Sequence, residues 1–326
     1  MSVLRWPRIQ DVPINMVVID HPPVSFPIYF SDTFTFPLPT THRFPAGKYA
    51  KTRELLLADN GISPNQLIQS TPIEPALICS AHDPDYVTAF LNGTLDARSI
   101  RRIGLPWSPE YAMRVRATLG GTLAAAEAAL ACGIAGNLAG GTHHALSDRG
   151  EGFCVFNDIA VAASVMLERG MVERVGVIDL DVHQGNGTAA ILGGDPRVHI
   201  LDLYARSNYP YRKVPASLDI PLEDGMRDGE YLALLDHALD SFFAKRHDII
   251  FYQAGVDLLE ADRLGRLSLT ADGVMERDRM VLGRAASLGV PIVLTLGGGY
   301  AQPIDVSVAA YAGTYRVAME VGWGQA

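Results

Sequence analysis

Short apolar runs rich in valine, isoleucine and leucine recur along the chain, and most of them end in glycine or aspartate. They occupy residues 133–141, 174–183, 197–204, 248–257 and 291–300. Stretches with a helical pattern lie between them, at 156–169, 229–246 and 270–288. Continuous apolar runs are typical of strands buried on both faces of a parallel sheet. The pattern therefore predicts an α/β fold whose ligand crevice lies at the carboxyl ends of the strands.

The N-terminal part of the chain has a different pattern. Its first forty-odd residues are rich in proline and aromatic residues, which favours irregular backbone with a short strand at 27–31. A helix is expected over 47–60, ended by Gly61. A second helix is expected over 109–132, because Ser108 followed by Pro and Glu has the composition of a helix start.

Composition narrows the class of protein. With 326 residues, 48% of them hydrophobic, the chain can bury a large core, and no repeat or linker divides it. We therefore expect a single domain over residues 1–326, with an irregular segment over about 1–45. The formal net charge of −9 argues against nucleic acid as a partner, because a phosphate backbone would be repelled.

Cysteine usage and hydropathy bear on the compartment. The three cysteines, Cys79, Cys132 and Cys154, are too few and too scattered for a disulfide framework, which predicts reduced thiols and a cytoplasmic location. Neither a signal-peptide pattern nor an apolar run long enough to span a membrane occurs.

Three polar residues alternate where the run 174–183 ends: Asp179, Asp181 and His183. Carboxylates and an imidazole on one side of a strand end would repel one another or stay poorly solvated without a cation. Asp257 ends another predicted strand and would complete a set of three ligands with Asp181 and His183, leaving a position open for water, as in catalytic zinc sites. Two alternatives remain open: a polar strand-to-loop transition, and Asp257 as a helix N-cap.

The adjacent histidines His143 and His144 follow a glycine-rich strand end. Two imidazoles facing one substrate suit general acid–base work at neutral pH. A catalytic histidine needs a partner on its other ring nitrogen; Asp179 is the candidate for His143, and Asn186 for His144. The alternative is a pair of surface histidines.

Tyr300 follows three glycines at 297–299 and could donate its hydroxyl to a developing oxyanion. The alternatives are a flexible glycine loop and a tyrosine in the core or at a rim. Cys154 is flanked by large apolar residues, which favours a buried thiol over a nucleophile.

Five segments, in this order, resemble the signature segments of zinc-dependent histone deacetylases and their bacterial relatives. They are Gly141-Thr-His-His-Ala145, Gly152-Phe-Cys-Val-Phe-Asn-Asp158, Asp179-Leu-Asp-Val-His-Gln-Gly-Asn-Gly187, Ala254-Gly-Val-Asp257 and Gly297-Gly-Gly-Tyr300. The resemblance implies the arginase/deacetylase fold, a three-layer α/β/α sandwich around a mostly parallel sheet of about eight strands.

Further details are similar to class IV histone deacetylases. Gln184 stands where most deacetylases carry a second histidine, and the segments 42–48, 147–154 and 257–268 are also similar to that class. The resemblance implies a deacylase that removes acetyl or longer fatty acyl groups from the side-chain amine of lysine or a lysine-like amine. The implied partner is an acyl-lysine peptide or protein, or a small acylated amine; the oligomeric state is not readable.

The resemblance also implies a role for each matching residue. The implied zinc ligands are Asp181, His183 and Asp257. The implied catalytic groups are His143, His144 and Tyr300, with Asp179 and Asn186 as partners. The implied tunnel wall is Gly152, Phe153, Tyr209 and Gly298. A possible potassium ion would take side-chain oxygens of Asp179 and Asp202 and backbone oxygens of Asp181, His183 and Leu203.

Three other functions are weighed against this one. An acetylpolyamine amidohydrolase is the first alternative, although the insertion expected of that group is absent between Ser80 and Ser108. An arginase-like ureohydrolase is more remote, because Gln184, Gly185 and Asn186 supply no second carboxylate for another metal. An inactive acyl-lysine-binding sensor is the non-enzymatic alternative, and retention of every chemical residue speaks against it.

Overall fold

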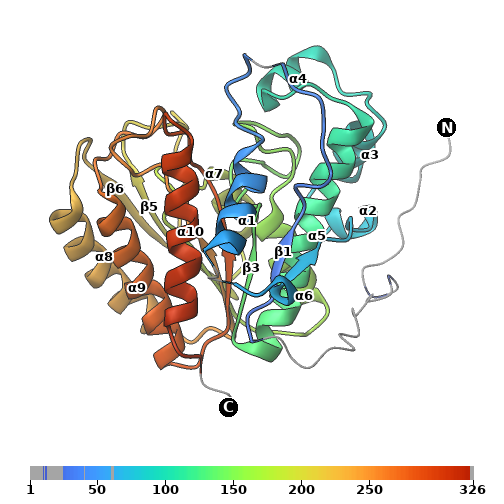
Figure 1. The fold of residues 1–326 in the computed structure, drawn as a ribbon. Helices are drawn as coiled ribbons and strands as arrows, with labels where there is room; N and C mark the ends of the chain where they lie inside the picture. Colours follow the sequence, from blue (N-terminus) through green and yellow to red (C-terminus); the bar gives the residue numbers. More distant parts are fainter. Residues whose placement is uncertain (1–9, 11, 13–24, 40, 60–61, 324–326) are drawn as a thin grey trace.

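In a computed structural model, one sheet of eight strands runs through the molecule (Figure 1). The structure describes residues 10, 12, 25–39, 41–59 and 62–323. Neighbouring strands are parallel throughout, in the order β2-β1-β3-β8-β7-β4-β5-β6. The strands are β1 (Ile28–Phe30), β2 (Leu67–Gln69), β3 (Ile134–Asn137), β4 (Val175–Asp179), β5 (Val198–Ala205), β6 (Leu218–Leu222), β7 (Ile249–Gln253) and β8 (Ile292–Thr295).

Helices cover both faces of the sheet and bury a hydrophobic cluster on each side. The helices are α1 (Lys48–Ala58), α2 (Pro75–Ile78), α3 (Pro84–Leu91), α4 (Ala97–Ile103), α5 (Pro109–Cys132), α6 (Asp158–Glu168), α7 (Asn186–Leu192), α8 (Asp228–Phe243), α9 (Ala271–Ser287) and α10 (Asp305–Glu320). One side is packed by α1, α8, α9 and α10, and the other by α2, α3, α5 and α6. The α/β prediction is confirmed.

The expected elements of the N-terminal half are present with small shifts at their ends. Strand β1 lies within 27–31, and α1 replaces the helix expected over 47–60. Helix α5 begins as predicted, because the Ser108 hydroxyl accepts a hydrogen bond from the Tyr111 amide at 3.1 Å. The expected stop at Gly61 and much of the irregular segment over about 1–45 lie outside the described residues. No helix of the described residues is long and apolar enough to cross a membrane.

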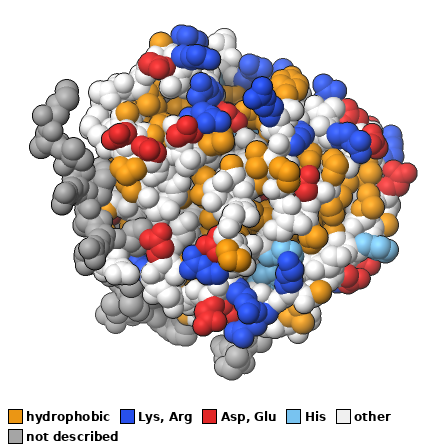
Figure 2. All heavy atoms as spheres, turned by 180° about the vertical axis from the view of Figure 1, so that it is seen from behind, with side chains coloured by type: hydrophobic (Ala, Val, Ile, Leu, Met, Phe, Trp, Pro, Cys, Tyr) orange, Lys and Arg blue, Asp and Glu red, His pale blue; other side chains and the backbone are white. Residues whose placement is uncertain are grey.

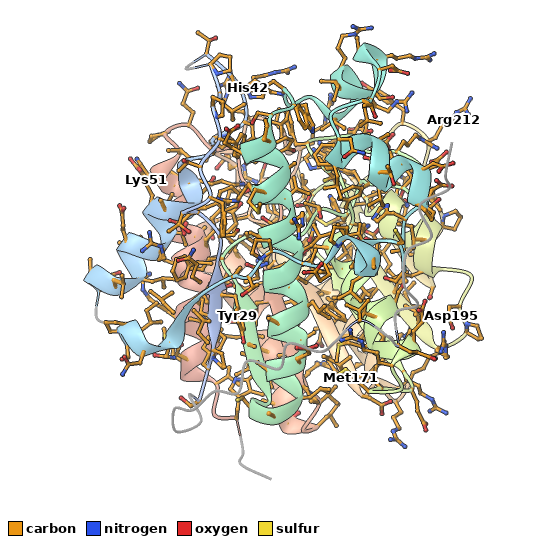
Figure 3. The ribbon with its side chains drawn as sticks, turned by 90° about the vertical axis from the view of Figure 1, so that its right-hand side faces the viewer. Tyr29, His42, Lys51, Met171, Asp195 and Arg212 are labelled. Atoms are coloured by element: carbon orange, nitrogen blue, oxygen red, sulfur yellow. The ribbon has the colours of Figure 1, made fainter. Side chains whose placement is uncertain are left out.

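The carboxyl ends of the central strands meet at one edge of the sheet. The register pairs Asp179 of β4 with Gln253 of β7, Gln253 with Thr295 of β8, and Thr295 with Asn137 of β3. The loops that leave these strands carry the polar segments identified in the sequence. In Figure 3, His42 and Arg212 lie toward one end of the molecule, whereas Met171 and Asp195, which precede β4 and β5, lie toward the other.

A buried ion pair on α9 hydrogen-bonds to β7 and to the loop that follows it. Arg277 and Asp278 are fully buried, with Arg277 Nη2 2.8 Å from Asp278 Oδ1. Arg277 Nη1 also donates to the Gly255 carbonyl at 2.5 Å, and the Tyr252 hydroxyl donates to Asp278 at 2.5 Å. The pair therefore ties α9 to β7 and to the loop that follows it.

Replacing Arg277 with methionine is expected to lower the free energy of unfolding by about 3–5 kcal/mol, because the Asp278 carboxylate would stay buried without its partner. Urea unfolding measures the change. Arg279→Met is the matched control, since its ion pair with Glu276 is exposed and contributes at most about 1 kcal/mol. Equal stability of Arg277→Met and the unaltered protein would contradict the prediction.

Candidate active site

Two carboxylates and an imidazole converge beyond the ends of β4 and β7. Nδ1 of His183 lies 3.0 Å from Asp181 Oδ1 and 3.1 Å from Asp257 Oδ2. One ligand atom from each residue lies within 4.8 Å of the others. Strand β4 already ends at Asp179, so the simple alternation expected from the sequence does not continue: the chain turns, and Asp179 faces His143 instead. No described helix begins directly after Asp257, which removes its interpretation as an N-cap.

Backbone amides orient the two carboxylates. The Val182 amide donates to Asp257 Oδ1 at 3.0 Å, and the Gly298 amide donates to Asp181 Oδ2 at 2.6 Å. A Cβ atom at Gly298 would overlap both carboxylates, and one at Gly255 would lie 2.5 Å from Asp181 Oδ2. Glycine at these two positions is therefore required by the close approach of backbone to the carboxylates.

The electrostatics of this cluster favour a positive charge at its centre. Burial alone would lower the pKa of His183, but hydrogen bonds to Asp181 and Asp257 and their charges outweigh it and raise the pKa to about 10. Burial raises the pKa of Asp257 to about 7, helped by the charge of Asp181. Two carboxylate oxygens and one imidazole nitrogen are a donor set that a divalent metal takes, and three protein ligands leave a position open. The residues present therefore fit a catalytic metal ion.

His143 is held by a carboxylate. Its Nδ1–H donates to Asp179 Oδ2 at 2.8 Å, and its Nε2 lies 3.8 Å from Asp181 Oδ1. Burial alone would lower the pKa of His143, but the charges of Asp179 and Asp181 outweigh it and raise the pKa to about 9. The carboxylates around His143 therefore favour its charged form.

His144 has a neutral partner. Its Nδ1–H donates to Asn186 Oδ1 at 2.8 Å, and Asn186 in turn donates to Glu151 Oε1 at 3.0 Å. Burial, with the charges of His143 and His183, lowers the pKa of His144 well below its ordinary value. The two imidazoles lie with ring centres 4.1 Å apart, yet one favours the charged form and the other the neutral form. Both are nearly inaccessible, at 3% and 5% exposure, so they are not a surface pair.

Hydrogen bonds with Asp262 and Lys48 hold the loop that carries Tyr300. Its amide donates to Asp262 Oδ2 at 2.6 Å. The buried ammonium of Lys48 donates to the Gly299 carbonyl at 3.2 Å and to the Tyr311 hydroxyl at 2.9 Å, and it lies 4.9 Å from the centre of the Tyr300 ring. These contacts hold the glycine segment 297–299, which is therefore not a free loop. Burial raises the pKa of Tyr300 well above its ordinary value, so its hydroxyl keeps its proton.

A cavity of about 690 Å³ joins these groups. Its lining includes the three candidate metal ligands, both histidines, Tyr300, and the expected tunnel residues Gly152, Phe153, Tyr209 and Gly298. The Tyr209 and His144 ring centres lie 4.9 Å apart. Phe153 packs against Phe44 at 5.5 Å between ring centres, and its φ of 66° lies in the left-handed region.

Two of the residues expected around potassium, Asp179 and Asp202, lie on neighbouring strands. Asp202 is paired with Asp179 across β4 and β5, and its Oδ2 accepts the Gly185 amide at 2.9 Å. Its other oxygen, Oδ1, is buried and has no hydrogen-bond partner among the described residues. Burial and the charge of Asp179 raise the pKa of Asp202 well above its ordinary value. Buried charges in proteins are usually paired or coordinate a metal ion, so this oxygen is a candidate ligand atom for a cation.

Four residues near the site were not identified from the sequence: Lys48, Glu151, Asn208 and Arg114. Lys48 and Glu151 act through Tyr300 and Asn186, as described above. Asn208 Nδ2 lies 3.3 Å from His183 Nε2. Nothing in the spacing of these residues points to the site, because each comes from a different segment and meets it only in the fold. The thiol of Cys154 is buried, and burial raises its pKa, which bears out its inert character.

Comparisons with known proteins agree with this arrangement. Residues 42–314 match the family model described as histone deacetylase domain. An uncharacterised protein of Picosynechococcus is 40% identical over 299 residues, covering 91% of this chain and all of the relative. Histone deacetylase 2 of Arabidopsis thaliana is 32% identical over 302 residues, covering 89% of this chain and 76% of the relative.

Solved structures agree with the fold. A crystal structure of a histone deacetylase homologue complexed with SAHA superposes with a TM-score of 0.77 at 24% identity, covering 90% of this chain and 84% of the other. A histone deacetylase homologue from Aquifex aeolicus gives a TM-score of 0.78 at 21% identity, with the same coverage.

Proposed function

The chain belongs to the histone deacetylase family, and on that premise we propose that it is a zinc-dependent hydrolase that removes acyl groups from the side-chain amine of lysine or a lysine-like amine. The observation that carries this proposal is the single cavity that joins Asp181, His183 and Asp257 to the histidine pair and Tyr300. A metal site, a neutral imidazole, a second imidazole whose raised pKa favours its charged form, and a phenol together suit the hydrolysis of an unactivated amide.

A zinc ion held by Asp181, His183 and Asp257 would polarise the acyl carbonyl and lower the pKa of the attacking water. His144 accepts the proton of that water, because its buried imidazole favours the neutral form and its Nε2 has no hydrogen-bond partner among the described residues. As the C–N bond breaks, the same nitrogen donates the proton to the leaving amine. Asn186 keeps His144 in the correct tautomer without adding a charge that would raise its pKa.

His143 and Tyr300 stabilise the negative charge that develops on the acyl oxygen. His143 stays protonated because of Asp179 and supplies a fixed positive charge. Tyr300 keeps its hydroxyl proton and donates it as a hydrogen bond. Lys48 and Asp262 are positioning residues that hold the Tyr300 loop.

We also propose a potassium ion at Asp202. The support is the buried Oδ1 atom of that residue, which lacks a hydrogen-bond partner among the described residues. Asp179 and the backbone of Leu203 would complete the site, with the backbone of Asp181 and His183. A cation there would favour the charged form of Asp202 and so fix the loop that carries Gly185.

Charges at the cavity mouth bear on the choice between lysine and polyamine substrates. The charged residues that line the outer part of the cavity are Arg43, Arg102 and Arg266, of which Arg266 is paired with Asp224 at 3.4 Å. In Figure 2, Lys and Arg side chains lie among Asp and Glu side chains at the end of the molecule where α4 lies in Figure 1, and others lie at the opposite end. Cations at the cavity mouth repel a polyamine that carries further positive charges along its chain. The arginines therefore favour an acyl-lysine over an acetylpolyamine.

Kinetics with acetyl-lysine, octanoyl-lysine and myristoyl-lysine peptides, beside acetylspermidine, test this proposal. We expect hydrolysis of at least one acyl-lysine, with kcat/KM at least about tenfold above that for acetylspermidine, since Arg43 and Arg102 at the mouth oppose the polycation. Preference for the polyamine would overturn the substrate assignment. Bound metal without turnover on any amide would instead favour an acyl-lysine-binding sensor.

A further inference from the structure

A buried arginine lines the inner part of the cavity. Arg114, on α5, is 7% exposed and lines the same cavity as the histidine pair. Its Nη1 donates to the Ser31 carbonyl at 2.8 Å. No ion pair joins Arg114 to any residue that the structure describes, because the nearby carboxylate of Asp32 is taken by Arg53 at 2.7 Å.

Burying a guanidinium without an ion-pair partner costs free energy. Charged side chains are almost never fully buried without a partner, since burial removes their hydration. Burial lowers the pKa of Arg114, which reflects that cost. A guanidinium also has five N–H donors in a planar fork, and the Ser31 carbonyl takes one of them. The remaining donors are left for a group that enters the cavity.

The surroundings of Arg114 suit a carboxylate at the end of an apolar chain. The inner lining combines apolar side chains, among them Val115, Leu119 and Phe156, with the side chains of Tyr49 and Tyr111. The Arg114 guanidinium lies 4.9 Å from the centre of the Tyr49 ring, which fixes the plane of the fork. The apolar walls would contact methylene groups, and the fork would bind two oxygens at their end.

The direction of entry decides which end of the substrate meets Arg114. The outer lining is exposed, with Tyr211 at 92%, whereas Arg114, Thr118 and Phe156 are buried. An acylated amine that enters from the exposed side brings its acyl group toward the buried end. The acyl group, not the amine, is therefore the part that reaches the guanidinium.

We propose that the inner cavity is a carboxylate subsite in which Arg114 binds the far end of the acyl group, so that the substrates are amines acylated by a dicarboxylic acid. This inference rests on the proposed function. In the reaction, water adds to the acyl carbon, the C–N bond breaks, the amine leaves with a proton, and the acid leaves with two carboxylates. Glutaryl-lysine and succinyl-lysine represent this substrate class.

Matched substrates test the subsite. Glutaryl-lysine and pentanoyl-lysine peptides have acyl chains of equal length and differ in the terminal carboxylate. We expect kcat/KM for the glutaryl peptide to exceed that for the pentanoyl peptide by about tenfold to a hundredfold, the usual effect of a buried charge-assisted hydrogen bond. That ratio should fall at least about tenfold in Arg114→Met and recover in part in Arg114→Lys, which keeps the charge but not the fork.

Arg116→Met is the matched control, because Arg116 lies on the same helix and donates to the Ile73 carbonyl instead. It should leave the ratio unchanged. A preference of the unaltered protein for the pentanoyl peptide, or a ratio that Arg114→Met does not change, would overturn the subsite.

Binding of the free acids separates this inference from the proposed function. Calorimetry on the purified protein should show tighter binding of glutarate than of pentanoate, and Arg114→Met should remove the difference. If that holds but no acyl-lysine is hydrolysed, the subsite stands and the proposed function fails. If acetyl-lysine is hydrolysed while the two acids bind alike in the unaltered protein and in Arg114→Met, the subsite fails and the proposed function stands.

Discussion

Replacing Asp181 with alanine is expected to remove bound metal and with it the hydrolysis of any amide. Asp181 contributes one of the three ligand atoms that lie within 4.8 Å of one another. Residues that only orient a metal ligand through a hydrogen bond contribute about 10- to 100-fold to metal affinity. Loss of a ligand itself should therefore lower the metal affinity by more than about 100-fold. Metal analysis by mass spectrometry after dialysis, together with an amide-hydrolysis assay, measures both effects.

Asp305→Ala is the matched control for this variant, because Asp305 is an exposed aspartate paired with Lys51 on the surface. It should keep its metal and its activity. Unchanged metal content in Asp181→Ala would contradict the ligand set. Loss of metal in both variants would point to general unfolding, which circular dichroism of each protein would reveal.

Tyr300→Phe is expected to lower kcat by about 10²–10³-fold while metal content stays the same, since removing one donor to a developing oxyanion has an effect of that size. Phenylalanine keeps the ring that packs 6.1 Å from Phe153 and 4.9 Å from the Lys48 ammonium. KM should change little, because the hydroxyl acts mainly in the transition state.

Tyr211→Phe removes a hydroxyl from an exposed tyrosine at the rim of the same cavity and serves as the control. Its kcat should match that of the unaltered protein. A Tyr300→Phe variant with near-normal kcat would reject the role of Tyr300, and parallel loss of metal would assign the effect to the structure of the loop.

Long apolar runs predicted the middle of the sheet well. Strands β4 and β7 lie inside the runs at 174–183 and 248–257, because strands buried on both faces have a clear pattern. The edge strands were not predicted. Strand β2 has three residues, and β6 contains Pro221, which is tolerated at the edge of a sheet but weakens the pattern.

Helix α10 was missed for a related reason. It begins at Asp305 without a side-chain cap at Ile304, so no start signal precedes it. The short helices α2, α3, α4 and α7 have too few turns for a periodic pattern. Their positions follow from contacts with the rest of the fold.

Residues adjacent in the sequence were the easiest part of the site to predict. His143 and His144 follow one strand, and Asp181 and His183 follow another, so parallel strand ends were expected to bring them together. The residues behind them were not predictable. Lys48 contacts the Gly299 carbonyl at a sequence separation of 251. Local sequence patterns do not predict a contact over such a distance along the chain.

The left-handed backbone conformation of Phe153 affects how the thermal stability of this protein could be raised by selection. A bulky residue at a φ of 66° costs about 1–3 kcal/mol, which glycine at the same position would recover. The Ile103 carbonyl, which accepts the Phe153 amide at 2.8 Å, and the neighbouring aromatic rings maintain the strained conformation. A screen for heat resistance would therefore select Phe153→Gly only where relief of this backbone strain exceeds the loss of the ring contacts with Phe44 and Tyr300.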